Sequence, residues 1–213
     1  RMNQVPRKSA NKLRALQEKQ LREILVYAQR HSSYYRRSFA AVGITEANVR
    51  NAPLSSFPTI DKAHFFEHFD EIVTVDVTQN ELRRFDTVEM SSSKIFKNQY
   101  HVVHSSGSTG KPSYFLYDET SWNTMLLGII RAALWNMNLP QLLHLLKSKP
   151  RVAYLAATDG RYGGAMAVGD GIQNIGGSTL ALDIKMPLEE WVQRIRAFRP
   201  NVIIGYPSAI KIL

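Results

Sequence analysis

The sequence has no cysteine and no long apolar segment among its 213 residues. Without cysteine, disulfide frameworks, thiolate metal sites and cysteine nucleophiles are all excluded. The longest apolar run extends from Met125 to Trp135 and is interrupted by Arg131, whereas a membrane-spanning helix needs about 20 apolar residues. The first residues also lack the apolar core of a secretory signal peptide. Because an absence of cysteine is compatible with a reducing cytosol, we expect a cytoplasmic protein.

Acidic residues are scarce in the first quarter of the chain. Residues 1–50 hold 11 Lys and Arg but three Glu, a net charge of +8, while the rest of the chain carries 16 basic and 15 acidic residues. This excess indicates either a solvent-facing helix surface or a basic module that binds nucleic acid or anionic lipid. Because no helix-turn-helix spacing or aromatic RNA motif is present, we do not expect nucleic-acid binding.

The first 72 residues predict a helical segment. Helices are predicted at residues 9–30, 33–41 and 59–69 from apolar spacing and flanking caps. The β-branched run 73–77 predicts a strand, while residues 78–98 show no clear pattern. We therefore divide the chain into a helical segment, residues 1–72, and an α/β part, residues 73–213.

Strands and helices alternate in the second part. Strands are predicted at residues 100–104, 114–117, 152–157, 178–184 and 201–205, and helices at 119–136 and 187–198. A glycine-bearing helix that packs closely on a sheet is predicted within residues 160–177. The short loops after residue 150 predict an α/β fold with a mostly parallel sheet flanked by helices. Because the chain ends soon after Pro207 should begin a helix, we expect the front part of a larger protein.

One loop has the composition of a phosphate site. The segment from His104 to Pro112 reads His-Ser-Ser-Gly-Ser-Thr-Gly-Lys-Pro and lies between two predicted strands. Gly107 and Gly110 allow the backbone to approach a ligand closely, and successive N–H groups in such a turn bind anions. Lys111 adds a positive charge. Hydroxyl donors come from Ser105, Ser106, Ser108 and Thr109.

This loop is neither of the two common nucleotide motifs. A Walker loop needs glycine where Ser105 stands and serine or threonine where Pro112 stands. A dinucleotide fingerprint has the form Gly-x-Gly-x-x-Gly and leads directly into a helix, and neither condition is met here.

The loop instead resembles the phosphate-binding loop of the adenylate-forming (acyl-adenylate synthetase) superfamily, especially its phenylacetate–CoA ligase and CapK-like branch. Further stretches are similar to motifs of that branch in the same order along the chain. They are Tyr34-Tyr35-Arg36-Arg37, Phe57 to Lys62, Thr158 to Gly164 with Gly176-Gly177, and Gly205-Tyr206-Pro207-Ser208. The ordered set is more specific than the loop alone.

The resemblance implies an enzyme that condenses a small carboxylic acid with ATP and Mg²⁺ to an acyl-adenylate and then transfers the acyl group, usually to coenzyme A. Aryl acids are the default of this branch, and a homodimer is compatible with it. The residues that match its phosphate loop are Ser105, Ser106, Gly107, Ser108, Thr109, Gly110 and Lys111. The loop would hold phosphates so that the carboxylate attacks in line.

Other parts of such a site are not matched in this chain. In the superfamily the adenine-, ribose- and magnesium-binding residues and the catalytic lysine lie beyond the point that corresponds to Leu213. We therefore assign no catalytic residue and no metal ligand here, and expect the 213 residues alone to be inactive.

The acyl pocket is predicted from the ends of two strands. Tyr162, Gly163 and Gly164 follow one predicted strand and Tyr206 follows another, and ligands of parallel α/β sheets bind at the carboxyl ends of strands. These tyrosines could equally be packed aromatics.

Two alternatives remain open. The parent could be a CapK-like protein of polysaccharide or secondary-metabolite biosynthesis with an acceptor other than coenzyme A, or the chain could act as a basic binding module through residues 1–50.

A metal site is not expected. His64 and His68 are spaced for one helix face, but no third ligand accompanies them.

Overall fold

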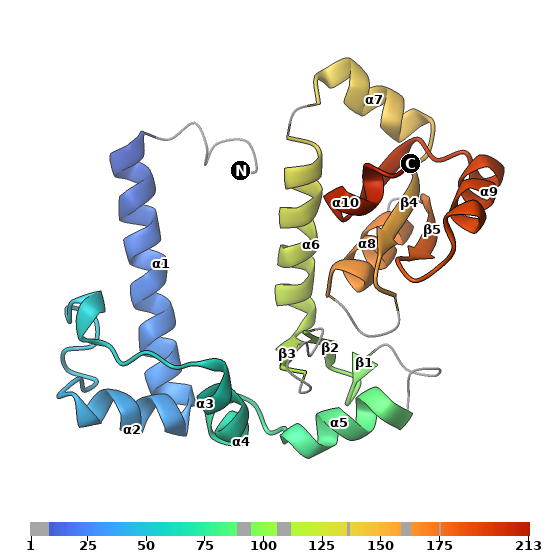
Figure 1. Cartoon of the computed structure of the whole chain (residues 1–213). Helices are drawn as coiled ribbons and strands as arrows, with labels where there is room; N and C mark the ends of the chain where they lie inside the picture. Colours follow the sequence, from blue (N-terminus) through green and yellow to red (C-terminus); the bar gives the residue numbers. More distant parts are fainter. Residues whose placement is uncertain (1–8, 89–94, 106–111, 136, 159–162, 175) are drawn as a thin grey trace. The chain divides into compact units, whose positions relative to one another are not determined.

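The computed structural model describes residues 9–88, 95–105, 112–135, 137–158, 163–174 and 176–213. The chain forms two compact units, residues 1–83 and 84–213, and each is treated by itself. Figure 1 labels their helices and strands.

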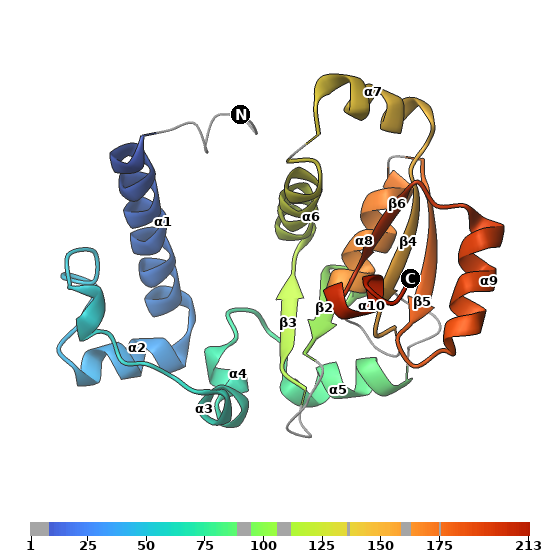
Figure 2. The same cartoon turned by 45° about the horizontal axis from the view of Figure 1, so that its top comes forward.

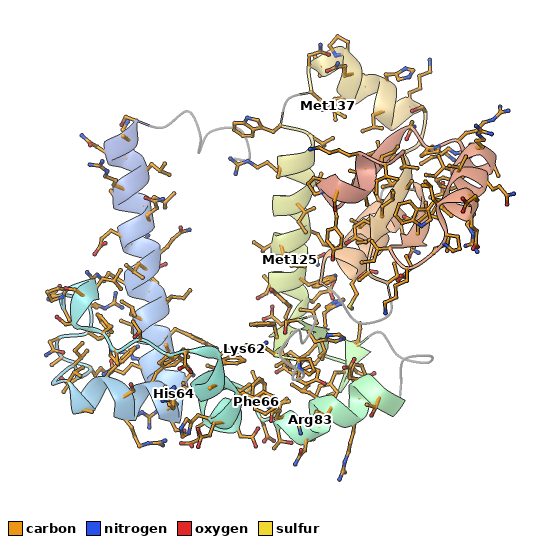
Figure 3. The ribbon with its side chains drawn as sticks, viewed as in Figure 1. Lys62, His64, Phe66, Arg83, Met125 and Met137 are labelled. Carbon is orange, nitrogen blue, oxygen red and sulfur yellow. The ribbon has the colours of Figure 1, made fainter. Side chains whose placement is uncertain are left out.

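The first unit is helical, as its sequence predicts. Its elements are α1 (Ala10–His31), α2 (Ser33–Ala41), a 3₁₀ turn (Leu54–Ser56), α3 (Lys62–Glu67), α4 (Phe69–Ile72) and the start of α5 (Gln79–Val88). A small core of Val26, Phe39, Ile44 and Val49 holds α1 and α2 together. The Ser32 hydroxyl accepts from the Tyr35 N–H and begins α2. Arg83 lies over the Phe66 ring, 5.1 Å from its centroid (Figure 3).

The predicted strand at residues 73–77 is wrong. These residues form no ladder, and the Val77 N–H donates to the Val75 carbonyl over 2.9 Å in a tight turn. Val77 is nevertheless buried, with 4% of its surface exposed. The β-branched run therefore does not pair as a strand, and of its side chains Val77 is the buried one.

The second unit holds two three-stranded sheets. An antiparallel sheet has the order β1 (Ile95–Phe96), β2 (Tyr100–His104), β3 (Tyr114–Tyr117). A parallel sheet has the order β5 (Ser178–Asp183), β4 (Arg151–Ala156), β6 (Val202–Gly205). The mixed α/β fold with a parallel sheet after residue 150 is confirmed, while residues 95–117 form a separate antiparallel sheet.

Helices cover both faces of the parallel sheet. The helices that contact its strands are α8 (Gly163–Asn174), α9 (Leu188–Phe198) and α10 (Pro207–Ile210), while α6 (Glu119–Ala133) packs on α8 and on the hairpin, and α7 (Leu139–Lys147) precedes β4. Figure 2 shows α8 on one face and α9 on the other. On the α9 face, Leu155 and Leu182 pack against Trp191. Alternate residues of β4 reach the opposite face, because successive side chains of a strand point to opposite sides.

Glycines let α8 and its flanking strands pack closely, as predicted from the sequence. A Cβ on Gly164 would lie 2.9 Å from the Tyr154 hydroxyl, and one on Gly177 would lie 2.6 Å from the Pro150 carbonyl. Any side chain at these positions would collide with the sheet. On its outer side α8 is joined to α6, since the Trp122 indole N–H donates to the Asp170 carboxylate over 3.2 Å.

Candidate functional site

The hairpin β2–β3 is tied at the base of the Ser/Gly-rich loop. The Ser105 N–H donates to the Ser113 carbonyl over 2.9 Å, and the Ser113 N–H donates to the Ser105 Oγ over 3.0 Å. These bonds extend the ladder that pairs His104 with Tyr114. The two strands were predicted at residues 100–104 and 114–117, and the structure places them there.

The structure describes the two ends of the predicted phosphate loop. Ser105 stands at the loop entrance with its hydroxyl already accepting one backbone hydrogen bond, which leaves its O–H free to donate. Ser106, Gly107, Ser108, Thr109, Gly110 and Lys111 lie outside the described residues. Their assignment to phosphate binding therefore stays a prediction.

The carboxylate of Asp86 contacts a residue next to each end of this loop. Asp86 of α5 accepts a hydrogen bond from the Tyr114 hydroxyl over 3.1 Å, and its other oxygen lies 3.6 Å from His104 Nε2. His104 Nδ1 in turn lies 2.8 Å from the Ser105 carbonyl oxygen. All three side chains are largely buried. Asp86 was not identified from the sequence, because residues 78–98 showed no clear pattern.

A signal for α5 was nevertheless present in the sequence. Thr78 and Glu81 have the spacing of a capping box, and in the structure the Thr78 N–H donates to Glu81 while the Glu81 N–H donates to the Thr78 hydroxyl. Leu82 and Phe85 are buried one turn apart on the same helix.

The carboxyl edge of the parallel sheet forms a second polar cluster. Asp183, at the end of β5, accepts from the Thr158 N–H at 2.7 Å and the Thr158 hydroxyl at 2.8 Å, and from the Lys185 N–H at 2.8 Å. The bonds from the Lys185 and Thr158 backbones hold the pKa of Asp183 below its usual range. The chain leaves β4 and β5 toward opposite faces of the sheet. In the strand order β5-β4-β6 the switch point, at which α/β sheets bind ligands, lies between the carboxyl ends of β4 and β6.

Three residues predicted for the acyl pocket, Gly163, Gly164 and Tyr206, lie among the described residues. Gly163 begins α8 beside the Val103 side chain, and Gly164 lies against the Tyr154 hydroxyl. Tyr206 follows β6 with 48% of its surface exposed. Burial, followed by the nearby Tyr206, raises the pKa of Tyr154. Tyr154 thus lies near both Gly164 and Tyr206. It was not singled out from the sequence, where it is one residue of a predicted apolar strand.

Tyr162 lies outside the described residues. Its predicted place in the acyl pocket stays a prediction. Gly163, Gly164 and Tyr206 are described, but no contact tests whether they face a ligand.

A stacked pair connects the hairpin to α6. The rings of His101 and Trp122 are 4.4 Å apart and 7° from parallel, and His101 Nε2 lies 3.2 Å from Glu119. Hydrogen bonds from His101 and then Asn123 hold the pKa of Glu119 below its usual range. Together with the bond from Trp122 to Asp170, this pair fixes β2 relative to α8.

His64 and His68 have separate partners in the first unit. His64 Nδ1 lies 2.9 Å from Asp61 and His68 Nδ1 lies 3.1 Å from Glu71 (His64 is labelled in Figure 3). Within the described ranges, no three His, Asp or Glu side chains are grouped closely enough to hold a metal ion. In the same ranges, no helix combines the length and the apolarity needed to cross a membrane.

Comparison with known proteins finds two ligases of similar sequence. The chain is 26% identical to phenylacetate-coenzyme A ligase of Escherichia coli (strain K12) over 204 residues, which cover 94% of this chain and 40% of that enzyme. It is 24% identical to phenylacetate-coenzyme A ligase of Aromatoleum evansii over 208 residues, which cover 96% of this chain and 40% of that enzyme. No family model matches the chain.

The expected resemblance to phenylacetate–CoA ligases is therefore confirmed, at low identity and over nearly the whole chain. The chain spans about two fifths of the length of these relatives. The CapK-like part of the resemblance is not tested by them.

Proposed function

We propose that these residues belong to an ATP-dependent carboxylic-acid ligase and supply its phosphate-binding loop. The strongest support is the hydrogen-bonded base formed by Ser105 and Ser113, which brackets the segment Ser-Ser-Gly-Ser-Thr-Gly-Lys. A Ser/Gly linker without function needs no such closure. The names of the two similar enzymes point to the same chemistry.

In this proposal the loop residues bind the β- and γ-phosphates of ATP. Hydroxyl and backbone N–H groups between Ser105 and Lys111 donate to phosphate oxygens, and the lysine compensates their charge. The acid then attacks the α-phosphorus in line, its carboxylate oxygen forms the new P–O bond, and pyrophosphate leaves. The contribution of the protein is positioning and charge stabilisation.

The acid is proposed to lie at the carboxyl edge of the parallel sheet. Gly163 and Gly164 begin α8 there, and the packing of Gly163 against Val103 brings this helix start to the strand that leads into the loop. Tyr154 and Tyr206 provide aromatic surface near it. An aryl acid fits such a wall, since aromatic rings favour offset and edge-to-face contacts.

ATP, Mg²⁺ and coenzyme A are proposed for the parent protein. No residue here is assigned to Mg²⁺, whose ligands we propose to lie in the part of the relatives that the match does not cover. When bound, the metal would supply charge neutralisation at the phosphates. No residue here is assigned to coenzyme A.

The proposal is tested by calorimetric titration of inorganic pyrophosphate into the 213-residue chain at low ionic strength. We expect Lys111→Ala to weaken binding by about tenfold, the loss of one charge-assisted contact. Lys147→Ala on α7 serves as the control, because this lysine is exposed and lies on another element. Equal affinity of Lys111→Ala and the unchanged chain would contradict the proposal.

A second measurement addresses catalysis. Because adenine, ribose and magnesium sites are proposed outside this chain, we expect the 213 residues to catalyse no exchange of labelled pyrophosphate into ATP with aryl acids. Exchange activity of the chain alone would show that the site is more complete than proposed.

One alternative keeps the same loop but changes the acceptor. A CapK-like enzyme would form the adenylate and then acylate an alcohol or amine. Product analysis of the complete protein with coenzyme A withheld would separate the two: turnover without coenzyme A favours the alternative.

A further inference from the structure

The carboxylate of Asp86 connects the two ends of the Ser/Gly-rich loop. On the exit side it accepts from the hydroxyl of Tyr114, whose neighbour Ser113 is bonded to Ser105. On the entry side it faces His104 Nε2 at 3.6 Å, and the opposite nitrogen of that ring donates to the Ser105 carbonyl oxygen. Because a carbonyl only accepts, Nδ1 carries the proton of this bond.

The side chains that make these contacts are mostly buried, which increases the energetic weight of each contact. The side chains of His104 and Asp86 are 10% and 14% exposed, and Tyr114 is 3% exposed. The hydrogen bond from Tyr114 to the Asp86 carboxylate is charge-assisted, and such bonds are roughly twice as strong as neutral ones. The 3.6 Å approach of His104 is an electrostatic contact longer than a hydrogen bond. The His104 and Tyr114 rings also meet edge to face, with centroids 6.1 Å apart.

We propose that Asp86 is a positioning residue that fixes the entrance and the exit of the phosphate-binding loop. This inference rests on the proposed function of that loop. Asp86 acts through Tyr114 on the strand that follows Ser113. It acts on the Ser105 carbonyl through the imidazolium form of His104, in which Nδ1–H donates to that carbonyl and Nε2–H faces Asp86. It does not itself contact phosphate, since a carboxylate would repel a polyphosphate.

The consequence of this arrangement is a lower cost of binding. The loop contains Gly107 and Gly110, and each ordered residue loses conformational freedom when a ligand is bound. Ends that are already fixed reduce the part of the chain that must be ordered on binding. A carboxylate linked to both ends keeps their separation constant when a ligand binds.

The test measures amide hydrogen exchange and pyrophosphate affinity of the 213-residue chain on the same variants. We expect Asp86→Ala to speed exchange at Ser105 and Ser113 by about tenfold and to weaken pyrophosphate binding by a similar factor, as the loss of a charge-assisted bond implies. Exchange at Leu155 and Leu182, in the parallel sheet, should stay unchanged. Arg84→Ala, an exposed position on the same helix, is the control.

A conservative variant distinguishes positioning from general packing. Asn at position 86 has the shape of Asp and its Oδ1 can still accept from Tyr114, but it carries no charge to pair with the His104 imidazolium. Asp86→Asn should therefore restore the exchange protection at Ser113 and leave the protection at Ser105 reduced, whereas an equal loss at both residues would indicate general packing.

The outcomes separate this inference from the proposed function. Unchanged exchange at Ser105 and Ser113 in Asp86→Ala overturns the positioning role. Asp86→Ala could unfold the chain and raise amide exchange at every residue. In that case Tyr114→Phe is the deciding variant. A selective rise in the exchange rate of Ser113 supports the positioning role, and an unchanged rate overturns it. If the unchanged chain binds no pyrophosphate, the phosphate-loop function fails, while exchange still decides whether Asp86 fixes the loop ends.

Discussion

At the scale of single residues, Asp183 shows how a loop carboxylate organises the edge of a sheet. Its two oxygens accept from two backbone N–H groups and one hydroxyl, supplied by Thr158 and Lys185. Three bonds to one ionised group hold the segments after β4 and β5 in a fixed relation. The same carboxylate was not singled out in the sequence, because an aspartate at the end of a strand is common.

The pKa of Asp183 sets a pH dependence of stability. Because its pKa in the folded chain lies below the value of about 3.9 for an unfolded aspartate, ionisation favours the folded state. This contribution is present above the unfolded pKa and is lost as the pH falls through the folded pKa. We expect Asp183→Asn to lower the free energy of unfolding at pH 7 by about 1 kcal/mol, since the group is partly exposed.

Urea denaturation of both proteins between pH 7 and pH 3 checks this expectation. The difference in unfolding free energy should shrink as the pH falls below about 4. Glu189→Gln, an exposed acid in α9, serves as the control. A difference that stays constant down to pH 3 would show that the effect comes from shape and not from charge.

At the scale of elements, β4 and β6 approach each other without room for a side chain at Gly205. A Cβ at this position would lie 2.4 Å from the Leu155 carbonyl oxygen and 2.8 Å from the Leu155 Cβ. The Tyr206 N–H donates to the same Leu155 carbonyl over 3.1 Å. Any residue other than glycine must therefore displace one of the two strands.

We expect Gly205→Ala to destabilise the second unit by about 1–3 kcal/mol, the usual cost of overpacking. The matched control is Gly128→Ala on α6, where a Cβ meets nothing within 4 Å. That change should stabilise the chain by up to about 1 kcal/mol through helix propensity. The urea concentration at the midpoint of unfolding, measured for both variants, checks these expectations. An unchanged midpoint for Gly205→Ala would contradict the close approach of the strands.

Prediction from sequence succeeded for elements with a strong local pattern. The strands at 100–104 and 114–117 are short runs of aromatic and aliphatic residues on either side of a Ser/Gly-rich turn, and the runs in β4, β5 and β6 are apolar and bounded by turns. Their positions therefore agree with the structure to within a residue or two. The run at 73–77 failed because β-branched residues also occur in buried turns. Helix α5 was missed because its apolar face is narrow, although its capping box was visible.

The residues predicted for the candidate site come from local motifs, and their ligand roles stay predictions. Ser105 and the glycines that begin α8 follow from short stretches of sequence, and the structure places Gly163 beside the strand that leads into the loop. Asp86 and Tyr154 were not predictable, because their roles depend on contacts with residues far along the chain. Pairings of this kind arise from tertiary packing, which local patterns do not encode.

At the scale of the whole molecule, positive charge is concentrated in the first part of the chain. Most of the net charge of +9 resides in residues 1–50, which lie in the first unit, while the predicted ligand positions lie in the second. On α1 several cations are paired at helical spacing, such as Arg22 with Glu18 at 2.7 Å. We infer that this basic surface is solvated.

We therefore expect only salt-sensitive, sequence-independent binding to duplex DNA. Fluorescence anisotropy should show weak binding at about 20 mM salt and none at about 150 mM, as counterion release requires. The triple variant Lys12→Gln, Arg14→Gln, Lys19→Gln should lose the low-salt signal, because these exposed residues lie on α1. Affinity that persists at 150 mM and disappears in the triple variant would favour a basic binding module.

The closed base of the β2–β3 hairpin has a consequence for engineering. Ser105 and Ser113 close the hairpin by one backbone bond and one bond to the Ser105 hydroxyl. We therefore expect the residues between them to be replaceable without loss of the β2–β3 ladder. Loops of other length or composition, grafted between these two serines, would be presented on the same rigid stem. The hairpin could thus serve as a scaffold on which phosphate-binding sequences from different ligases are compared in one background.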